Sequence, residues 1–116
     1  MTQRQLSEFL QDILDTITDI ETFTENVEFE AFQANREKVL AVVKLIEILG
    51  EAVKKIPDDI RNQYPDIPWK SIAGMRDVLV HEYWGIDANI IWATVQEGLP
   101  PLKATIAEIA LDFPDE

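Results

Sequence analysis

Apolar residues recur every three or four positions along much of the chain, which is the spacing of one face of an α-helix. The first stretch runs from Leu6 to Ile20 and has acidic residues between its apolar positions, namely Glu8, Asp12, Asp15 and Asp19. The second begins at Phe29 and continues to Ile56, where Pro57 is expected to stop it. These patterns predict two amphipathic helices joined by a polar turn over residues 22–28.

The second half of the chain predicts three shorter helices. Residues 57–68 hold three prolines and are expected to form a loop. A helix over about 70–83 should follow and end at Gly85. A fourth helix should start after Asp87 as its N-cap, bury Ile90, Ile91 and Val95, and be broken by Gly98 and Pro100-Pro101 before a last helix over 102–113. No segment alternates with a period of two, so we predict an all-α protein: an up-down bundle of four to five helices, with residues 1–116 as one domain.

Gly50 interrupts the broadest apolar stripe, which runs from Val39 to Leu49 and indicates burial on more than one side. A glycine inside a helix costs about 1 kcal/mol relative to alanine, so a structural reason is expected. One interpretation is a close crossing with another helix of the same chain. The other is a close crossing with a helix of a second subunit, and the sequence leaves both open.

Composition removes several classes of function. The chain of 116 residues has 22 acidic and 10 basic side chains, a net charge of −12, which disfavours a general nucleic-acid coat. Without cysteine it has no disulfide, cysteine-ligated zinc or iron–sulfur cluster, and its four glycines form no phosphate-binding loop. We expect no metal and no cofactor. No apolar run has the length of a membrane span and no signal sequence is evident, so a cytoplasmic protein without membrane contact is expected.

Candidate chemistry gathers on the helix predicted over 70–83. Arg76 and Tyr83 are seven residues apart and share a face, as do Asp77 and His81, four apart. Arg76 and His81 are about 140° apart around an ideal helix. They could still converge on one phosphate through the length of the arginine or if the last turn unwinds at Gly85, and a helix of a second subunit could close the site. An arginine that holds a phosphate and an imidazole that moves a proton suit metal-independent cleavage of RNA through its own 2′-OH. Because one histidine cannot easily be both acid and base, a two-fold dimer is expected.

Simpler interpretations stand beside these. Spacing alone favours an ordinary surface pair for Arg76 and His81, and Asp77 with His81 is a common helical pair. The three tryptophans, Trp69, Trp84 and Trp92, are expected in the core or in a groove. Asp58 and Asp59 are expected in a solvated loop, and the acidic residues of the first helix on a solvated face or against a basic partner.

The string from Tyr64 to Tyr83 closely resembles the HepT-like family of HEPN domains. Glu47–Ala52 upstream, and Ile91-Trp92 followed by Leu99-Pro100 downstream, resemble the same family in the same order. The arginine–four residues–histidine–x–tyrosine motif within this context is the strongest element of the resemblance.

The resemblance implies a specific function. Members of the family are helical homodimers that act as metal-independent ribonucleases and serve as toxins of toxin–antitoxin modules. The antitoxin is a minimal nucleotidyltransferase of the MntA type that transfers AMP to the motif tyrosine. Arg76 and His81 would then be the catalytic residues, Tyr83 the AMP acceptor, and Asp77 a supporting residue beside the arginine. The alternatives are a non-catalytic dimeric module that binds a nucleotide or presents Tyr83 to such a transferase, and a bundle in which the motif is purely structural.

Overall fold

Four long helices set the architecture of this computed structural model. They are α1 (Gln3–Thr24), α3 (Arg36–Val53), α5 (Trp69–His81) and α7 (Leu99–Asp112). Shorter segments join them: α2 (Phe29–Ala34), α4 (Asp58–Arg61), α6 (Ala88–Ala93) and a π-helical turn, η1 (Thr94–Gly98). The structure describes residues 2–81 and 87–113, with the side chains of Gln3 and of residues 76–81 excepted. No strand occurs in these ranges, and the predicted all-α class is confirmed.

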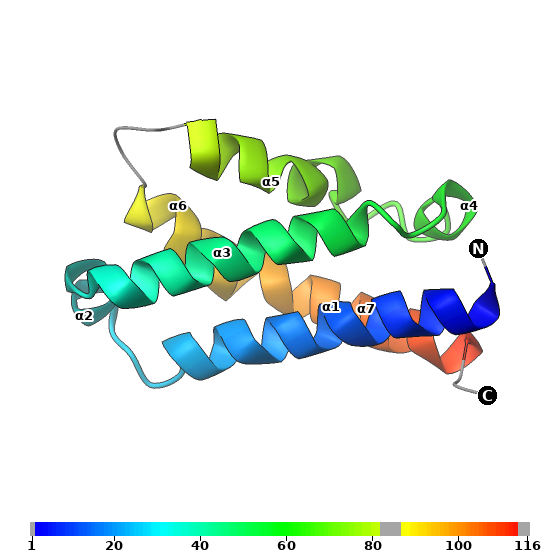
Figure 1. Ribbon diagram of the computed structural model, residues 1–116, viewed down its shortest axis with the longest axis horizontal. Coiled ribbons are helices and arrows are strands. Elements are labelled where there is room, and N and C mark those ends of the chain that lie inside the picture. Colours follow the sequence, from blue (N-terminus) through cyan, green and yellow to red (C-terminus); the bar gives the residue numbers. More distant parts are fainter. Residues whose placement is uncertain (1, 82–86, 114–116) are drawn as a thin grey trace.

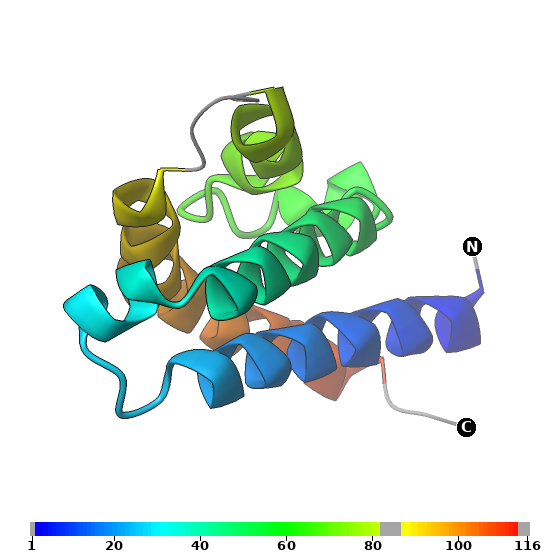
Figure 2. The same cartoon turned by 60° about the vertical axis from the view of Figure 1, so that its left-hand side comes forward.

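Successive long helices run in opposite directions, as an up-down bundle requires (Figure 1). Helix α3 is central: α1 packs along one side of it and α5 along another. Helix α7 packs on α1, and the turned view shows α1 and α7 below α3, with α5 above it (Figure 2). The broad apolar stripe of α3 is explained by this position, because α3 has neighbours on more than one side. Among the described residues, no helix is both long and apolar enough to cross a membrane.

The core lies between α1, α3 and α7. Its fully buried side chains come from all three helices and include Leu10, Ile13, Ile17, Ile46, Leu49, Leu102, Ile106 and Ile109. The start of α1 is fixed by a capping box, in which Gln5 N–H donates to Thr2 Oγ1 (3.1 Å) and Thr2 N–H to Gln5 Oε1 (3.0 Å). The acidic residues Glu8, Asp12, Asp15 and Asp19 are all exposed, which both interpretations of this face, solvent or a basic partner, require.

The prediction of one helix from Phe29 to Ile56 is wrong, because the chain breaks at Asn35. Asn35 ends α2 and begins α3 with an extended backbone (φ −98°, ψ 90°), and its side chain accepts from the N–H of Lys38 at 3.0 Å. An asparagine at this position stabilises a new helix start and so competes with continuation of the old helix. The apolar spacing continues across the break and therefore hides it.

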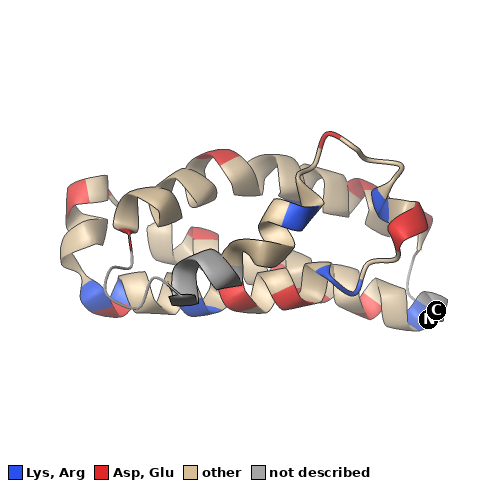
Figure 3. Cartoon of the chain, turned by 90° about the horizontal axis from the view of Figure 1, so that it is seen from above, with Lys and Arg blue, Asp and Glu red and all other residues tan. Residues whose placement is uncertain are grey.

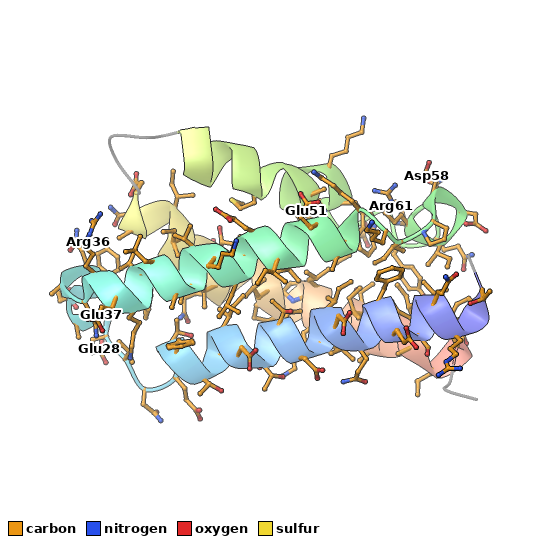
Figure 4. The ribbon with its side chains drawn as sticks, viewed as in Figure 1. Glu28, Arg36, Glu37, Glu51, Asp58 and Arg61 are labelled. Atoms are coloured by element: carbon orange, nitrogen blue, oxygen red, sulfur yellow. The ribbon has the colours of Figure 1, made fainter. Side chains whose placement is uncertain are left out.

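The segment over 57–68 is not wholly a loop, since it contains the single helical turn α4. Pro57 precedes this turn, and Asp58 pairs with Arg61 within it (Figure 4). Asp58 and Asp59 are exposed, as expected.

The predicted break at Gly98 and Pro100-Pro101 is also wrong, because the chain continues through η1 directly into α7. The N–H of Leu99 bonds the carbonyl of Thr94, five residues back, and the prolines then occupy the first turn of α7. A proline is tolerated there because first-turn N–H groups have no partner within the helix. Asp87 is the N-cap of α6 as predicted, with its carboxylate accepting from Asn89 N–H at 2.9 Å. Ile91 and Val95 are buried, but Ile90 is 41% exposed, against the prediction.

Candidate active site

Helix α5 carries three of the four predicted site residues. Its backbone is helical without interruption through Arg76, Asp77 and His81, so these residues keep the helical register that the sequence predicts. The contacts of their side chains lie outside the described part of the structure, and so does Tyr83. The described residues around them define how α5 is held and what lies beside it.

The start of α5 is anchored by Trp69. This side chain is buried, and its indole Nε1 donates to the carbonyl oxygens of Arg61 (3.1 Å) and Tyr64 (3.0 Å). The single donor thus ties α5 to the chain that leaves α4. Trp92 is half-buried and packs against Phe29 and Phe32, with ring centroids 5.9 and 5.1 Å away. The predicted core or groove role is confirmed for Trp69 and Trp92, whereas Trp84 lies outside the described residues.

Gly50 fixes the distance between α3 and α5. A β-carbon at Gly50 would lie 3.2 Å from the carbonyl oxygen of Ile72 and 3.3 Å from that of Ala73. Such distances are too short for ordinary packing, so the missing side chain allows the two backbones to approach closely. Of the two interpretations of Gly50, the structure therefore shows the crossing within one chain.

A cleft of about 400 Å³ lies between α3, α5 and the start of α7. Its walls are mostly apolar and come from segments far apart in the sequence, including Ile46, Leu49, Ile72, Met75 and Leu99. Met75, which lines it, directly precedes Arg76. Sequence reasoning missed this cleft, because each of its walls follows the ordinary helical spacing of a core residue.

The charge of the cleft is negative as far as it is described. Asp66 and Glu97 are the charged residues among the described lining, and both are acidic. Figure 3 looks onto this side of the molecule, with α5 in front. A phosphate bound in this cleft would need a cation from outside the described lining. Arg76 directly follows Met75, which lines the cleft. No group of three His, Asp or Glu residues that could hold a metal ion occurs in the described ranges.

Tyr64, which lies near the anchor of α5, has a phenol whose pKa is raised above its ordinary value. Partial burial, followed by the negative charges of Glu108 and Asp112, raises the pKa of the Tyr64 phenol. Tyr64 is partly buried against the core, and the raised pKa keeps its phenol neutral over a wider range of pH.

Comparison with known families identifies the family of the chain. Residues 13–109 match the family described as ribonuclease HepT-like. This range includes α5 and the residues that line the cleft. The chain belongs to the HepT-like family. Its HEPN-like helical fold, expected from the resemblance, is thereby supported as well.

Individual HepT-like relatives cover almost the whole chain. A Methanocaldococcus jannaschii protein, provisionally named as an RNase, is 46% identical over 113 residues, 97% of this chain and 93% of the relative. A second from the same organism, named likewise, is 42% identical over 116 residues, all of both chains. A Thermococcus cleftensis protein named as a probable ribonuclease HepT is 40% identical over 107 residues, 92% of this chain and 97% of the relative. No solved structure matches the chain.

Proposed function

We propose that this HepT-like chain is a metal-independent endoribonuclease whose catalytic residues are Arg76 and His81. The observation that carries the proposal is that Arg76 and His81, the two proposed catalytic positions in this member of a ribonuclease family, lie on one unbroken helix. The first turns of that helix are held in place by the hydrogen bonds of Trp69 and by close packing against Gly50 of α3. The position of the helix relative to α3 is therefore fixed before it reaches Arg76. A fixed start is what a catalytic helix needs, because small displacements of reacting groups are costly.

The proposed reaction uses the RNA as its own nucleophile. A base removes the proton of a 2′-OH, the oxygen attacks the neighbouring phosphorus, and the bond to the 5′-oxygen breaks as an acid protonates that oxygen. Arg76 stabilises the charge on the phosphoryl oxygens, and His81 supplies the proton transfer. Asp77, one helical turn before His81, is the proposed supporting residue beside the arginine.

A homodimer provides the second proton-transfer group. Because the backbone of α5 remains helical through His81, the positions of Arg76 and His81 are about 140° apart around the axis of an ideal helix. Two chains related by a two-fold axis can bring the arginines and histidines of both chains to one shared cleft, where one histidine acts as the base and the other as the acid. The apolar cleft beside α5, with half-buried Ile72 and Met75, supports an interface on this side of the molecule.

Tyr83 is the proposed point of control. In this proposal the ribonuclease is the toxin of a toxin–antitoxin pair, and a minimal nucleotidyltransferase of the MntA type attaches AMP to the Tyr83 hydroxyl. The added phosphate would compete for Arg76, and the purine would occupy space that RNA needs.

The negative charge of the molecule favours one alternative. With a net charge of −12 and only acidic residues among the charged, described lining of the cleft, the chain could instead be a non-catalytic dimer. Such a module would bind a nucleotide or present Tyr83 to the transferase without cutting RNA.

Cleavage of a labelled RNA in the presence of a chelator separates the two functions. The wild-type protein should cut the RNA, whereas His81→Ala and Arg76→Ala should each lose at least about a hundredfold in rate, as is typical when a general acid–base or charge-stabilising group is removed. Lys70→Ala is the matched control, because Lys70 is an exposed cation on the same helix. An intact RNA with all four proteins, or equal cleavage by all four, contradicts the proposal and favours the non-catalytic module.

A further inference from the structure

A second surface, on the α1 side of α3, has no place in the proposed reaction. A shallow furrow of about 360 Å³ runs between these two helices. Its floor consists of Phe9 and Thr16 from α1 and of Ile48 and Ala52 from α3. Since Ile48 is 44% exposed although α3 is the central helix, an apolar side chain faces water where the fold offers no cover.

The apolar character of the furrow continues along α1. Phe9, Thr16 and Phe23 are spaced by seven residues and therefore share one face of α1. Phe23 is 40% exposed, so this face of α1 has a second uncovered apolar side chain besides Ile48 of α3. An uncovered apolar surface along a helix fits the apolar face of another helix.

The banks of the furrow are acidic. Three of its lining residues, Asp12, Asp15 and Glu51, are acids, and one, Lys55, is a base. Figure 4 labels Glu51 on α3, and Asp12 and Asp15 belong to the exposed acidic face of α1. Helix α1 as a whole has five acidic residues and one basic residue, a net charge of −4. The apolar and the acidic residues line the same furrow, so a molecule bound there must present both an apolar surface and positive charge.

We propose that the furrow between α1 and α3 is a docking site for a cationic amphipathic helix of a partner protein. The apolar face of that helix would cover Ile48 and Phe9, and its lysines or arginines would lie against Asp12 and Asp15. A second copy of this chain is a poorer occupant, because its own α1 carries the same negative charge. RNA and anionic membranes are repelled by the same field. The proposal does not depend on the ribonuclease activity, since no residue of the furrow belongs to the proposed catalytic site.

A synthetic peptide serves as the probe. It has about 18 residues, five helical turns, with leucines along one face and lysines along the other, and its binding is followed by fluorescence anisotropy. A peptide with glutamates in place of the lysines is the control for charge and should not bind. Binding of the lysine peptide should weaken as salt rises, because the attraction is between exposed charges.

Two matched pairs of variants locate the site on the protein. Ile48→Gln should weaken binding of the lysine peptide about tenfold, the effect of losing one buried aliphatic side chain, whereas Leu111→Gln, at an 81% exposed residue of α7, should change it less than about twofold. The double variant Asp12→Asn/Asp15→Asn should weaken binding roughly three- to tenfold. Glu30→Gln/Asp59→Asn removes the same charge from exposed positions of α2 and α4 and should have little effect.

Three results would overturn the docking site. Equal weakening by the two acidic double variants means that the peptide responds only to total charge. Equal effects of Ile48→Gln and Leu111→Gln mean that the apolar floor is not used. A change in the protein's own mass in solution on Ile48→Gln, without peptide, means that a second copy covers the furrow. The ribonuclease assay should be unchanged by Ile48→Gln, so this test and the test of catalysis can fail separately.

Discussion

The α-carbon of Gly50 in α3 faces the carbonyl oxygen of Ile72 in α5 so closely that a β-carbon would lie 3.2 Å from that oxygen. The two helices therefore meet backbone to backbone at this point. Four residues beyond Ile72, the same helix reaches Arg76, so the crossing fixes where the motif begins. Gly50 is unfavourable for helix α3 itself, but it allows the close approach of α5, the helix that carries the candidate catalytic residues.

Substitution of Gly50 should reverse the usual effect of alanine in a helix. An alanine normally stabilises a helix interior by about 1 kcal/mol relative to glycine. At Gly50 the new methyl group would press on two carbonyl oxygens of α5, whose own helical hydrogen bonds hold them in place, and overpacking of this kind costs about 1–3 kcal/mol. Gly50→Ala should therefore lower the free energy of unfolding, measured by urea denaturation, and reduce RNA cleavage by displacing α5.

Gly74 is the matched control for this prediction. It lies within α5, and a β-carbon there would meet no atom within 4 Å. Gly74→Ala should thus raise the free energy of unfolding by up to about 1 kcal/mol. If both alanine variants are stabilised equally, the close approach at Gly50 is not a constraint.

The sequence predicts the elements better than their junctions. The spacing of Leu10, Ile13 and Ile17 predicts α1 and its buried face because both depend on residues within a few positions of each other. The break at Asn35 could not be recognised in the same way. The capping of α3 depends on the single side chain of Asn35, and the three-to-four-residue spacing of apolar residues continues across it. The passage through Pro100 was missed for the converse reason: a proline ends a helix in its interior but not in its first turn.

The candidate site shows the same division. The residue types and their helical register were predictable, because Arg76 and His81 are close in sequence and lie in one helix. The cleft was not, since Ile46 and Leu99 reach it from helices that only tertiary packing brings together. The anchoring of α5 by Trp69 was also hidden, because its indole donates to carbonyl groups five and eight residues away, one at the end of α4 and one just beyond it.

Alkaline pH should destabilise the fold through Tyr64. Its phenol has an ordinary pKa of 10.0, which the folded state raises through partial burial and the charges of Glu108 and Asp112. The unfolded chain therefore releases this proton first, and the stability that Tyr64 contributes is present below pH 10 and lost as the pH rises toward the higher pKa of the folded state. Tyr64→Phe should flatten the fall in unfolding free energy between about pH 9 and pH 11.

Glu108→Gln tests the cause of this shift. It removes one of the negative charges that raise the pKa while leaving the phenol in place, so the alkaline loss of stability should become smaller but remain. An alkaline profile that is the same in the wild-type protein and in Tyr64→Phe would show that other groups are responsible.

The proposed composite site would require a dimer. Light scattering at micromolar concentration should give twice the 13.3 kDa mass of the chain. Mixing His81→Ala with Arg76→Ala should then restore part of the cleavage, because a mixed dimer can contain one site with both an intact arginine and an intact histidine. A monomer that cleaves RNA, or mixed variants that stay inactive after verified exchange, would contradict a site shared between two chains.

Tyr83 should act as the switch of the ribonuclease. Arg76 and Tyr83 are seven residues apart, a spacing that places two helical residues on one face, so AMP on the Tyr83 hydroxyl would bring a phosphate toward the guanidinium that RNA needs. Incubation with a cognate nucleotidyltransferase, ATP and Mg²⁺ should increase the intact mass by whole AMP units and abolish RNA cleavage.

Tyr83→Phe should escape the modification and keep at least part of the cleavage, because the ring is retained and only the acceptor oxygen is lost. Tyr64→Phe, which removes the other tyrosine hydroxyl of the chain, should be modified like the wild type. Equal labelling of Tyr83→Phe, or loss of labelling in Tyr64→Phe alone, would place the acceptor on a different residue, and the switch would then have to work without competition for Arg76.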